Sequence, residues 1–129
     1  MDRQRVASGA ALEDRFGYSR AVRVGPHIWV SGTAPIIPGD ADPPDDPYEQ
    51  ASLCIGIIER ALAELGATLD DVVRTRIYIT DVADMDEVGR AHAEAFGGSR
   101  PATTGIVTEL LDPRWRVEIE AEAVAPTPL

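Results

Sequence analysis

Two segments alternate apolar and charged residues, and their charged positions could carry chemistry. RVEIEAEAV, residues 116–124, places Glu118 and two further glutamates on one face of a predicted strand. VVRTRIYIT, residues 72–80, places Arg74 and Arg76 on one face of another. A carboxylate in such a place could act as a general acid or base, or could pair with an arginine. Because glutamates on one face repel each other, we expect the arginine face to lie beside them, or the upper part of the strand to be exposed.

The other reactive side chains favour structural roles. His92 falls on the apolar stripe of a predicted helix and is interpreted as a packed or interface histidine, while His27 lies in a turn. Neither has a second His or Cys at metal-ligand spacing, so no metal site is expected. Cys54 lies on the apolar stripe of another predicted helix, which favours a buried thiol over a nucleophile. The chain has no lysine, which excludes Schiff-base chemistry on lysine.

The composition is typical of one small globular domain. The chain has 129 residues, 44% of them hydrophobic, and we expect a single domain over residues 1–129. A formal net charge of -10 argues against nucleic acid as a partner, because phosphate binding needs clustered cations. No apolar run reaches the roughly 20 residues of a membrane helix, and the charged N-terminus does not resemble a signal peptide. With one cysteine, these features predict a cytoplasmic protein without membrane partners.

Periodicity predicts a β-β-α-β-α-β-β order, with an extra strand near residues 3–8. In the first hairpin, Val22 and Val24 share one face of the strand and Arg23 lies on the other. In the strand predicted at residues 72–80, Val73 is expected on the apolar face. Capping patterns at Asp46 and Asp84 predict the two helix starts. The predicted elements are residues 19–25, 27–34, 47–65, 72–80, 85–96, 102–110 and 116–124. We expect an α+β fold, with a mixed β-sheet and two helices on one face.

The segment PIIPGDADPPDDP, residues 35–47, interrupts this order. Its prolines prevent strand pairing and its aspartates favour water, so it is interpreted as an exposed loop. Its length for a compact domain leaves a lid or mobile flap as the alternative.

Five segments in order resemble the Rid (YjgF, endoribonuclease L-PSP) family. They are FGYSRAVRVG, WVSGTAP, LDDVVRTRIYITDVADMDEV, RPATT and VEIEAEAV, and their spacing is continuous from Tyr18 to Val124 except at the 35–47 loop. The resemblance implies a chorismate-mutase-like fold and a homotrimer whose sheets form a central barrel, with a cleft between each pair of subunits. It also implies hydrolysis of reactive enamines and imines, such as 2-aminoacrylate, without a metal or organic cofactor.

The resemblance assigns part of a small-molecule site. The family's cleft tyrosine falls on Tyr18, the serine of its S-G motif on Ser31, and the glutamate that places a water molecule on Glu118. We therefore expect Glu118 to be catalytic and Tyr18 and Ser31 to bind substrate. Interface ion pairing for Glu118 and ordinary half-burial for Tyr18 are the alternatives. Trp29, opposite the apolar face of its strand, is expected to line a cleft or an interface.

The other half of that site departs from the family. The arginine that grips a carboxylate falls on Thr103, and the cysteine two residues later falls on Gly105. Guanidinium binds carboxylate through two charge-assisted hydrogen bonds, and losing such a contact costs on the order of 2–4 kcal/mol. We expect Thr103 and Gly105 to remain in the substrate site, with Arg76 or Arg100 as replacement cations. Thr103 as a space-filling strand residue is the alternative.

Three functions remain open. One is a Rid-like hydrolase acting on a small imine, enamine or related carbonyl compound, but weakly or not at all on 2-imino acids. The second is a trimer that binds a small metabolite in its clefts without turnover. The third, an RNA-cleaving translation inhibitor, fits poorly with the negative charge.

Overall fold

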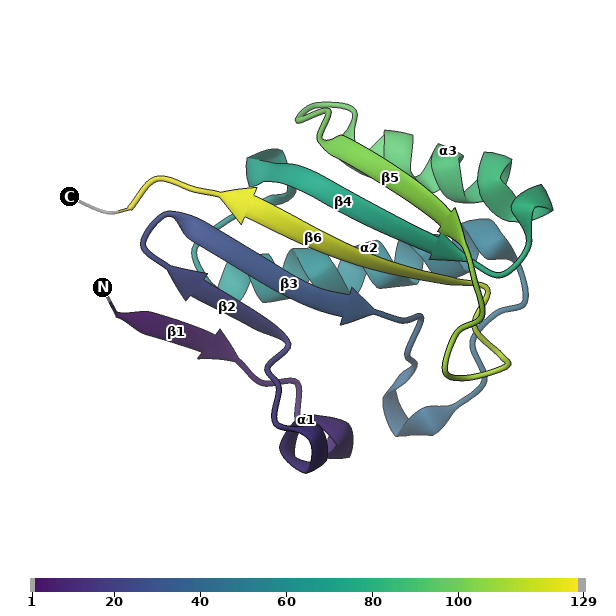
Figure 1. Cartoon of the computed structure of the whole chain (residues 1–129), viewed down its shortest axis with the longest axis horizontal. Helices are drawn as coiled ribbons and strands as arrows, with labels where there is room; N and C mark the ends of the chain where they lie inside the picture. The colour runs from purple at the N-terminus through teal and green to yellow at the C-terminus, as the bar shows by residue number, and fades with distance from the viewer. Residues whose placement is uncertain (1, 128–129) are drawn as a thin grey trace.

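The computed structural model describes residues 2–127, which form one mixed sheet covered on one face by two helices (Figure 1). The sheet order is β1-β2-β3-β6-β4-β5, and only the β4–β5 pair is parallel. The strands are β1 (Arg3–Val6), β2 (Ala21–Val24), β3 (His27–Thr33), β4 (Val72–Ile79), β5 (Ala102–Val107) and β6 (Val117–Val124). The helices are α1 (Ala11–Phe16), α2 (Pro47–Glu64) and α3 (Met85–Phe96). The predicted mixed sheet with helices on one face is confirmed; α1 was not expected.

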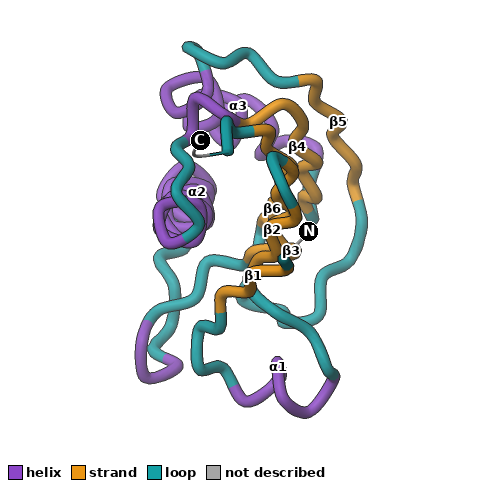
Figure 2. Tube along the Cα trace, turned by 90° about the vertical axis from the view of Figure 1, so that its left-hand side faces the viewer, coloured by secondary structure: helices purple, strands orange, loops and turns teal. Residues whose placement is uncertain are grey.

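The two faces of the sheet differ in chemistry. Seen from the side, α2 and α3 form a layer against one face, here called the helix face (Figure 2). The buried core lies between them, and it includes Ile28, Ile58, Leu62, Ile77, Phe96 and Ile119. The opposite face, here called the open face, carries the alternate residues of β4 and β6. Period-two alternation therefore separates an apolar interior from a charged surface, as the sequence predicts.

Helix α2 starts as the capping pattern predicts. Asp46 accepts a hydrogen bond from Glu49 N at 2.9 Å, and Pro47 occupies the first turn. Helix α3 starts after Asp84 as predicted, but the Asp84 side chain makes no capping hydrogen bond and instead pairs with Arg116 at 3.0 Å. Asp81 caps the preceding 3-10 turn by accepting from Ala83 N. The buried Asp84 carboxylate therefore pairs with the partly exposed Arg116 and not with the backbone at the start of the helix.

Two strand residues lie on faces that the sequence does not predict: Val73 because the alternation is broken, and Arg23 because the arginine face of β2 is the buried one. The register of β4 against β6 shifts between Val72 and Arg74, so Val72 is buried and Val73 is 47% exposed. The expectation that Val73 faces the core is therefore wrong, because an irregularity in the ladder changes the alternation. Arg23 is buried on the helix face, where its guanidinium donates to Leu65 O at 2.6 Å and Pro126 O at 3.0 Å. It thereby ties the end of α2 to the C-terminal segment.

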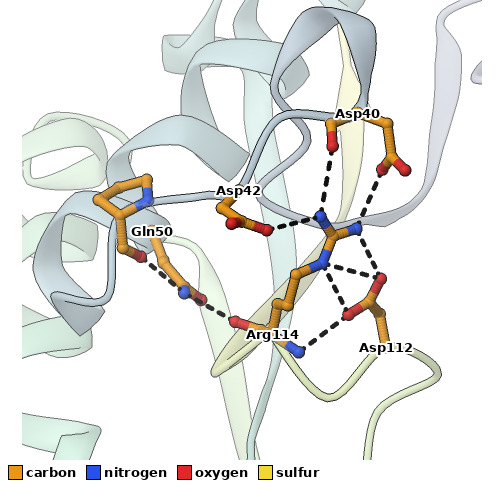
Figure 3. Close-up of polar contacts among 6 residues, drawn as sticks. Asp40, Asp42, Gln50, Asp112 and Arg114 are labelled. Carbon is orange, nitrogen blue, oxygen red and sulfur yellow. Dashed lines mark hydrogen bonds and ion pairs between the residues drawn. The ribbon is translucent and has the colours of Figure 1, made fainter.

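The 35–47 loop is held by exposed ion pairs and by a buried side-chain amide (Figure 3). On the outside, Arg114 pairs with Asp40 at 3.0 Å and Asp42 at 3.1 Å, while Asp112 holds its other edge at 2.8 Å. Deeper, the fully buried Gln50 amide donates to Pro44 O at 2.8 Å and to Arg114 O at 3.0 Å. The loop is therefore attached to the 112–116 segment, as well as being exposed in part. None of the helices described is long and apolar enough to span a bilayer.

Gln50→Ala is expected to lower the free energy of unfolding by about 2–4 kcal/mol, because it leaves Pro44 O, Arg114 O and Arg116 N without their buried partner. Urea unfolding measures the change. Glu59→Gln, on the exposed side of the same helix, is the control and should change stability by less than about 0.5 kcal/mol. A Gln50→Ala protein as stable as the control contradicts the proposed anchoring.

Candidate functional site

Glu118 lies on the open face, at the start of β6 and opposite Tyr78 of β4. Its carboxylate packs over Gly32: a β-carbon built on Gly32 would lie 2.8 Å from Glu118 Oε2. A larger residue at Gly32 would displace the Glu118 carboxylate from its present position. Partial burial raises the pKa of the Glu118 carboxyl, Glu120 adds to the increase, and Arg20 opposes it. A carboxyl whose pKa is raised is suited to exchanging protons with a bound molecule near neutral pH.

Arg20 interacts electrostatically with the Glu118 carboxylate. It was not identified as a site residue from the sequence. It is 8% exposed, and its Nη2 donates to Ser31 O and Gly32 O, both at 2.7 Å. Within the described chain it forms no salt bridge, and its buried Nε has no hydrogen-bond partner. Burial lowers the pKa of the Arg20 guanidinium. The sequence offers only an arginine between Ser19 and Ala21, and nothing local indicates that it turns inward.

Tyr18 and Ser31 lie beside this arginine. Ser31 Oγ donates to Ser19 O at 2.7 Å, and Ser31 N donates to Arg20 O at 3.0 Å, which joins the segment before β2 to β3. Tyr18 is 42% exposed, and its phenol lies near enough to Arg20 to interact with it electrostatically. We call Tyr18, Arg20, Ser31, Gly32 and Glu118 the glutamate cluster. Three of the residues predicted to form the site therefore come together.

Trp29 does not join the glutamate cluster. It lies on the open face, 46% exposed, and pairs across the ladder with Glu122. Glu122 is four residues beyond Glu118, or roughly 13 Å along the strand. Trp29 stacks on His27 at a ring separation of 6.0 Å. The side chain therefore belongs to the exposed surface of the sheet.

Arg76 also lies on the open face, paired with the glutamates of β6. Its Nη1 is 3.0 Å from Glu122 and 3.7 Å from Glu120, and Tyr78 donates to Glu120. The hydrogen bond to Glu122 raises the pKa of Arg76. The expectation that the arginine face lies beside the glutamates is confirmed. Arg76 is thereby engaged on the face opposite Thr103, so within one protomer it does not stand in for the family's arginine.

Thr103 lies on the helix face of the edge strand β5. Its hydroxyl is 2.8 Å from Thr75 Oγ1, which is in turn 2.8 Å from His92 Nε2 on α3. Gly105 lies further along β5, where an added β-carbon would contact Met85 Sδ at 3.8 Å. We call Thr75, His92, Thr103 and Gly105 the threonine cluster. The neighbouring Thr104 points the other way and accepts from Arg74 at 2.6 Å.

Arg100, the second candidate replacement cation, lies in the exposed turn between α3 and β5. Its φ is 49°, and its backbone N–H donates to Phe96 O at 2.7 Å. This left-handed turn is what brings the chain back from α3 to the edge of the sheet.

The glutamate cluster and the threonine cluster are on opposite faces of the same sheet. Glu118 borders a hollow of about 180 Å³, lined also by Tyr78 and residues 108–111. That is below the roughly 300 Å³ of a usual small-molecule pocket. One protomer thus presents two half-sites. Among the described residues, no group of three His, Cys, Asp or Glu side chains could hold a metal ion.

Comparison with known proteins places the chain in a family. The sequence profile described as Endoribonuclease L-PSP matches residues 8–125. An uncharacterized protein of Streptomyces coelicolor is 40% identical over 121 residues, which is 93% of this chain and 90% of that protein. The 2-iminobutanoate/2-iminopropanoate deaminase of mouse is 32% identical over 108 residues, covering 83% of this chain and 80% of the enzyme.

Solved structures of related proteins support the same family assignment. The crystal structure of Rv2704 from Mycobacterium tuberculosis, described as a member of the YjgF/YER057c/UK114 family, superposes with a TM-score of 0.87 at 47% identity. The match covers 96% of this chain and 100% of that one. The chain therefore belongs to the Rid (YjgF, endoribonuclease L-PSP) family, with that family's fold.

Proposed function

We propose that this protein is a homotrimeric hydrolase of small imines and enamines, with its sites in clefts between protomers. The position of the Glu118 carboxyl carries the proposal: it is half-buried over Gly32, has a raised pKa, and interacts electrostatically with the buried guanidinium of Arg20. The similarity to the mouse deaminase supports the same reaction class. We further propose a cytoplasmic location, since the free Cys54 suits a reducing compartment.

The opposed half-sites support a cleft shared by two chains. In the proposed assembly the open faces meet in a central barrel, and the glutamate cluster of one protomer faces the threonine cluster of the next. The open face suits burial in part because Arg76 already pairs with Glu120 and Glu122. It also carries exposed apolar side chains, including Trp29, Ile106 and Val124.

The proposed reaction uses Glu118 as a base and then as an acid. The carboxylate accepts a proton from water as the water oxygen attacks the C=N carbon, and the imine nitrogen takes up a proton, which gives a carbinolamine. The proton taken up by the imine nitrogen comes from solvent. Glu118 then gives its proton to the leaving nitrogen while the carbinolamine hydroxyl loses its proton to solvent, so that the C–N bond breaks, ammonia or an amine departs and a carbonyl compound remains. Atoms balance as imine plus water giving carbonyl plus amine. Tyr18 and Ser31 border this half of the cleft.

Binding without turnover is the second candidate, and Thr103 favours it. A threonine hydroxyl cannot replace the two charge-assisted bonds of a guanidinium, so the family's usual anionic substrates lose their anchor. A cleft that still holds an uncharged metabolite would then act as a sensor or scavenger. For RNA cleavage we expect no activity, because the chain carries a net charge of -10.

Sedimentation of the wild-type protein is expected to give three times the chain mass. Trp29→Asp should dissociate the assembly, because it removes an apolar contact from the open face and sets a new carboxylate beside Glu122. Val82→Asp is the control, since Val82 is 71% exposed in a turn outside that face. A monomeric wild-type protein contradicts the shared cleft.

Glu118→Gln is expected to reduce catalysed imine hydrolysis about 10²- to 10⁴-fold, because it removes the proton acceptor. Uncharged imines released by a flavin amine oxidase, and imino acids released by an amino-acid oxidase, can be followed by loss of semicarbazone trapping. Glu122→Gln, on the same strand but paired with Arg76, is the control. Acceleration that survives unchanged in Glu118→Gln rules out this role, and ligand binding without any acceleration supports the binding module instead.

Glu118→Gln is also expected to change the pH dependence of stability. A carboxyl whose pKa is raised in the folded protein binds more protons folded than unfolded, so wild-type stability falls as pH rises from about 4.3 through the raised value. The variant lacks this loss, so it should equal the wild type at low pH and exceed it at neutral pH. Urea unfolding across this range, at one protein concentration, measures the difference. A variant that is less stable at neutral pH contradicts the buried-carboxyl interpretation.

A further inference from the structure

A chain of hydrogen bonds connects α3 to the exposed edge of β5. His92 Nε2 lies 2.8 Å from Thr75 Oγ1, Thr75 Oγ1 lies 2.8 Å from Thr103 Oγ1, and Thr103 Oγ1 lies 3.1 Å from Pro101 O. Thr75 is fully buried, whereas Thr103 is exposed. The chain therefore starts in the core and ends where a ligand in the proposed cleft would lie.

The directions of these bonds follow from the chemistry of the ends. The carbonyl of Pro101 can only accept, so the single proton of the Thr103 hydroxyl goes to it. Thr103 then accepts from Thr75, because Thr103 has no second proton to give. Thr75, having used its proton, accepts in turn from His92 Nε2, which must carry hydrogen. Every proton in the chain is thereby assigned, and each points from the core towards β5.

The surroundings of His92 favour the neutral ring, which can donate a hydrogen bond from Nε2 to Thr75. Its ring packs against Phe96, with centroids 4.7 Å apart, and burial lowers its pKa, which favours the neutral ring at pH 7. A neutral ring with hydrogen on Nε2 donates to Thr75 and leaves Nδ1 as an acceptor. The tautomer is thus fixed by the two threonines.

We propose that this chain makes Thr103 an acceptor, so that the cleft selects ligands that present an N–H or O–H group there, such as a primary amide or amine, over carboxylates. This inference rests on the proposed shared cleft. The hydroxyl of Thr103 has one lone pair left, which can only receive a proton. A carboxylate has no proton to offer and can bind only by taking the one that Thr103 gives to Pro101 O.

The charges around Thr103 also disfavour carboxylate ligands. Arg74, the cation next along the ladder, contacts Thr104 on the open face at 2.6 Å, and Arg76 is paired with Glu120 and Glu122. Neither reaches across the sheet to the helix face. The chain as a whole carries a charge of -10, which disfavours anions further. Arg74 and Arg76 therefore leave the helix-face side of Thr103 without a cation, and Arg100, in the exposed turn before Pro101, is the nearest remaining arginine in the sequence.

Pyruvamide and pyruvate test the proposal, because they differ in the amide and carboxylate alone. Ligand-observed NMR titration of the wild-type protein is expected to give about 5- to 10-fold tighter binding of pyruvamide. Thr103→Val, which removes the hydroxyl at nearly constant volume, should abolish the preference, and Thr103→Arg should reverse it. Thr104→Val is the matched control on the opposite face and should keep the wild-type preference.

The outcomes separate the two proposals. Equal binding of both compounds, or tighter binding of pyruvate to the wild type, overturns the selectivity and leaves the shared cleft standing. Binding of neither compound to the wild type or to Thr103→Arg overturns the cleft and the selectivity together. The ¹⁵N NMR spectrum of the histidines is a measurement that needs no ligand. We expect hydrogen on His92 Nε2, and a changed Nε2 chemical shift in Thr75→Val. Hydrogen on His92 Nδ1 instead would overturn the proposed direction of the hydrogen bonds.

Discussion

The strict alternation of β6 is the constraint on which the rest of the structure depends. Val117, Ile119, Ala121 and Ala123 are buried under the helices, so the intervening glutamates must all face the other way. Those glutamates then require cations, which β4 supplies through Arg76. The same alternation on β4 sends Thr75 to the helix face. The separation of the glutamate cluster from the threonine cluster is thus a consequence of burying one face of a single strand.

Much of the fold could be predicted from local patterns, and the failures have physical causes. The hairpin of β2 and β3, the Asp46 cap of α2 and the buried Cys54 all follow from short-range periodicity and capping. Val73 was misplaced because a shift in ladder register leaves no mark in the sequence. The start of α3 after Asp84 was predicted, but its missing capping bond was not, because the competing partner, Arg116, is 32 residues away.

The site was predictable only in part, for the same reason. Family resemblance located Glu118, Tyr18 and Ser31, which the fold brings together, and it exposed the substitution at Thr103. It could not identify Arg20, because a buried arginine looks like a surface arginine until the carbonyls that surround it are placed. The bonds from Thr103 through Thr75 to His92 likewise need the packing of α3 on the sheet, which joins residues from three separate elements.

The two depths of attachment of the 35–47 loop give it a graded response to ionic strength. Asp40 and Asp42 are almost fully in water, each with 88% of its side chain exposed, so dissolved ions compete for Arg114 there. The bond from Gln50 to Pro44 is shielded from those ions and involves no net charge. In concentrated salt the ion pairs of Asp40 and Asp42 with Arg114 are therefore weakened, while the hydrogen bond from Gln50 to Pro44, next to the start of α2, is retained.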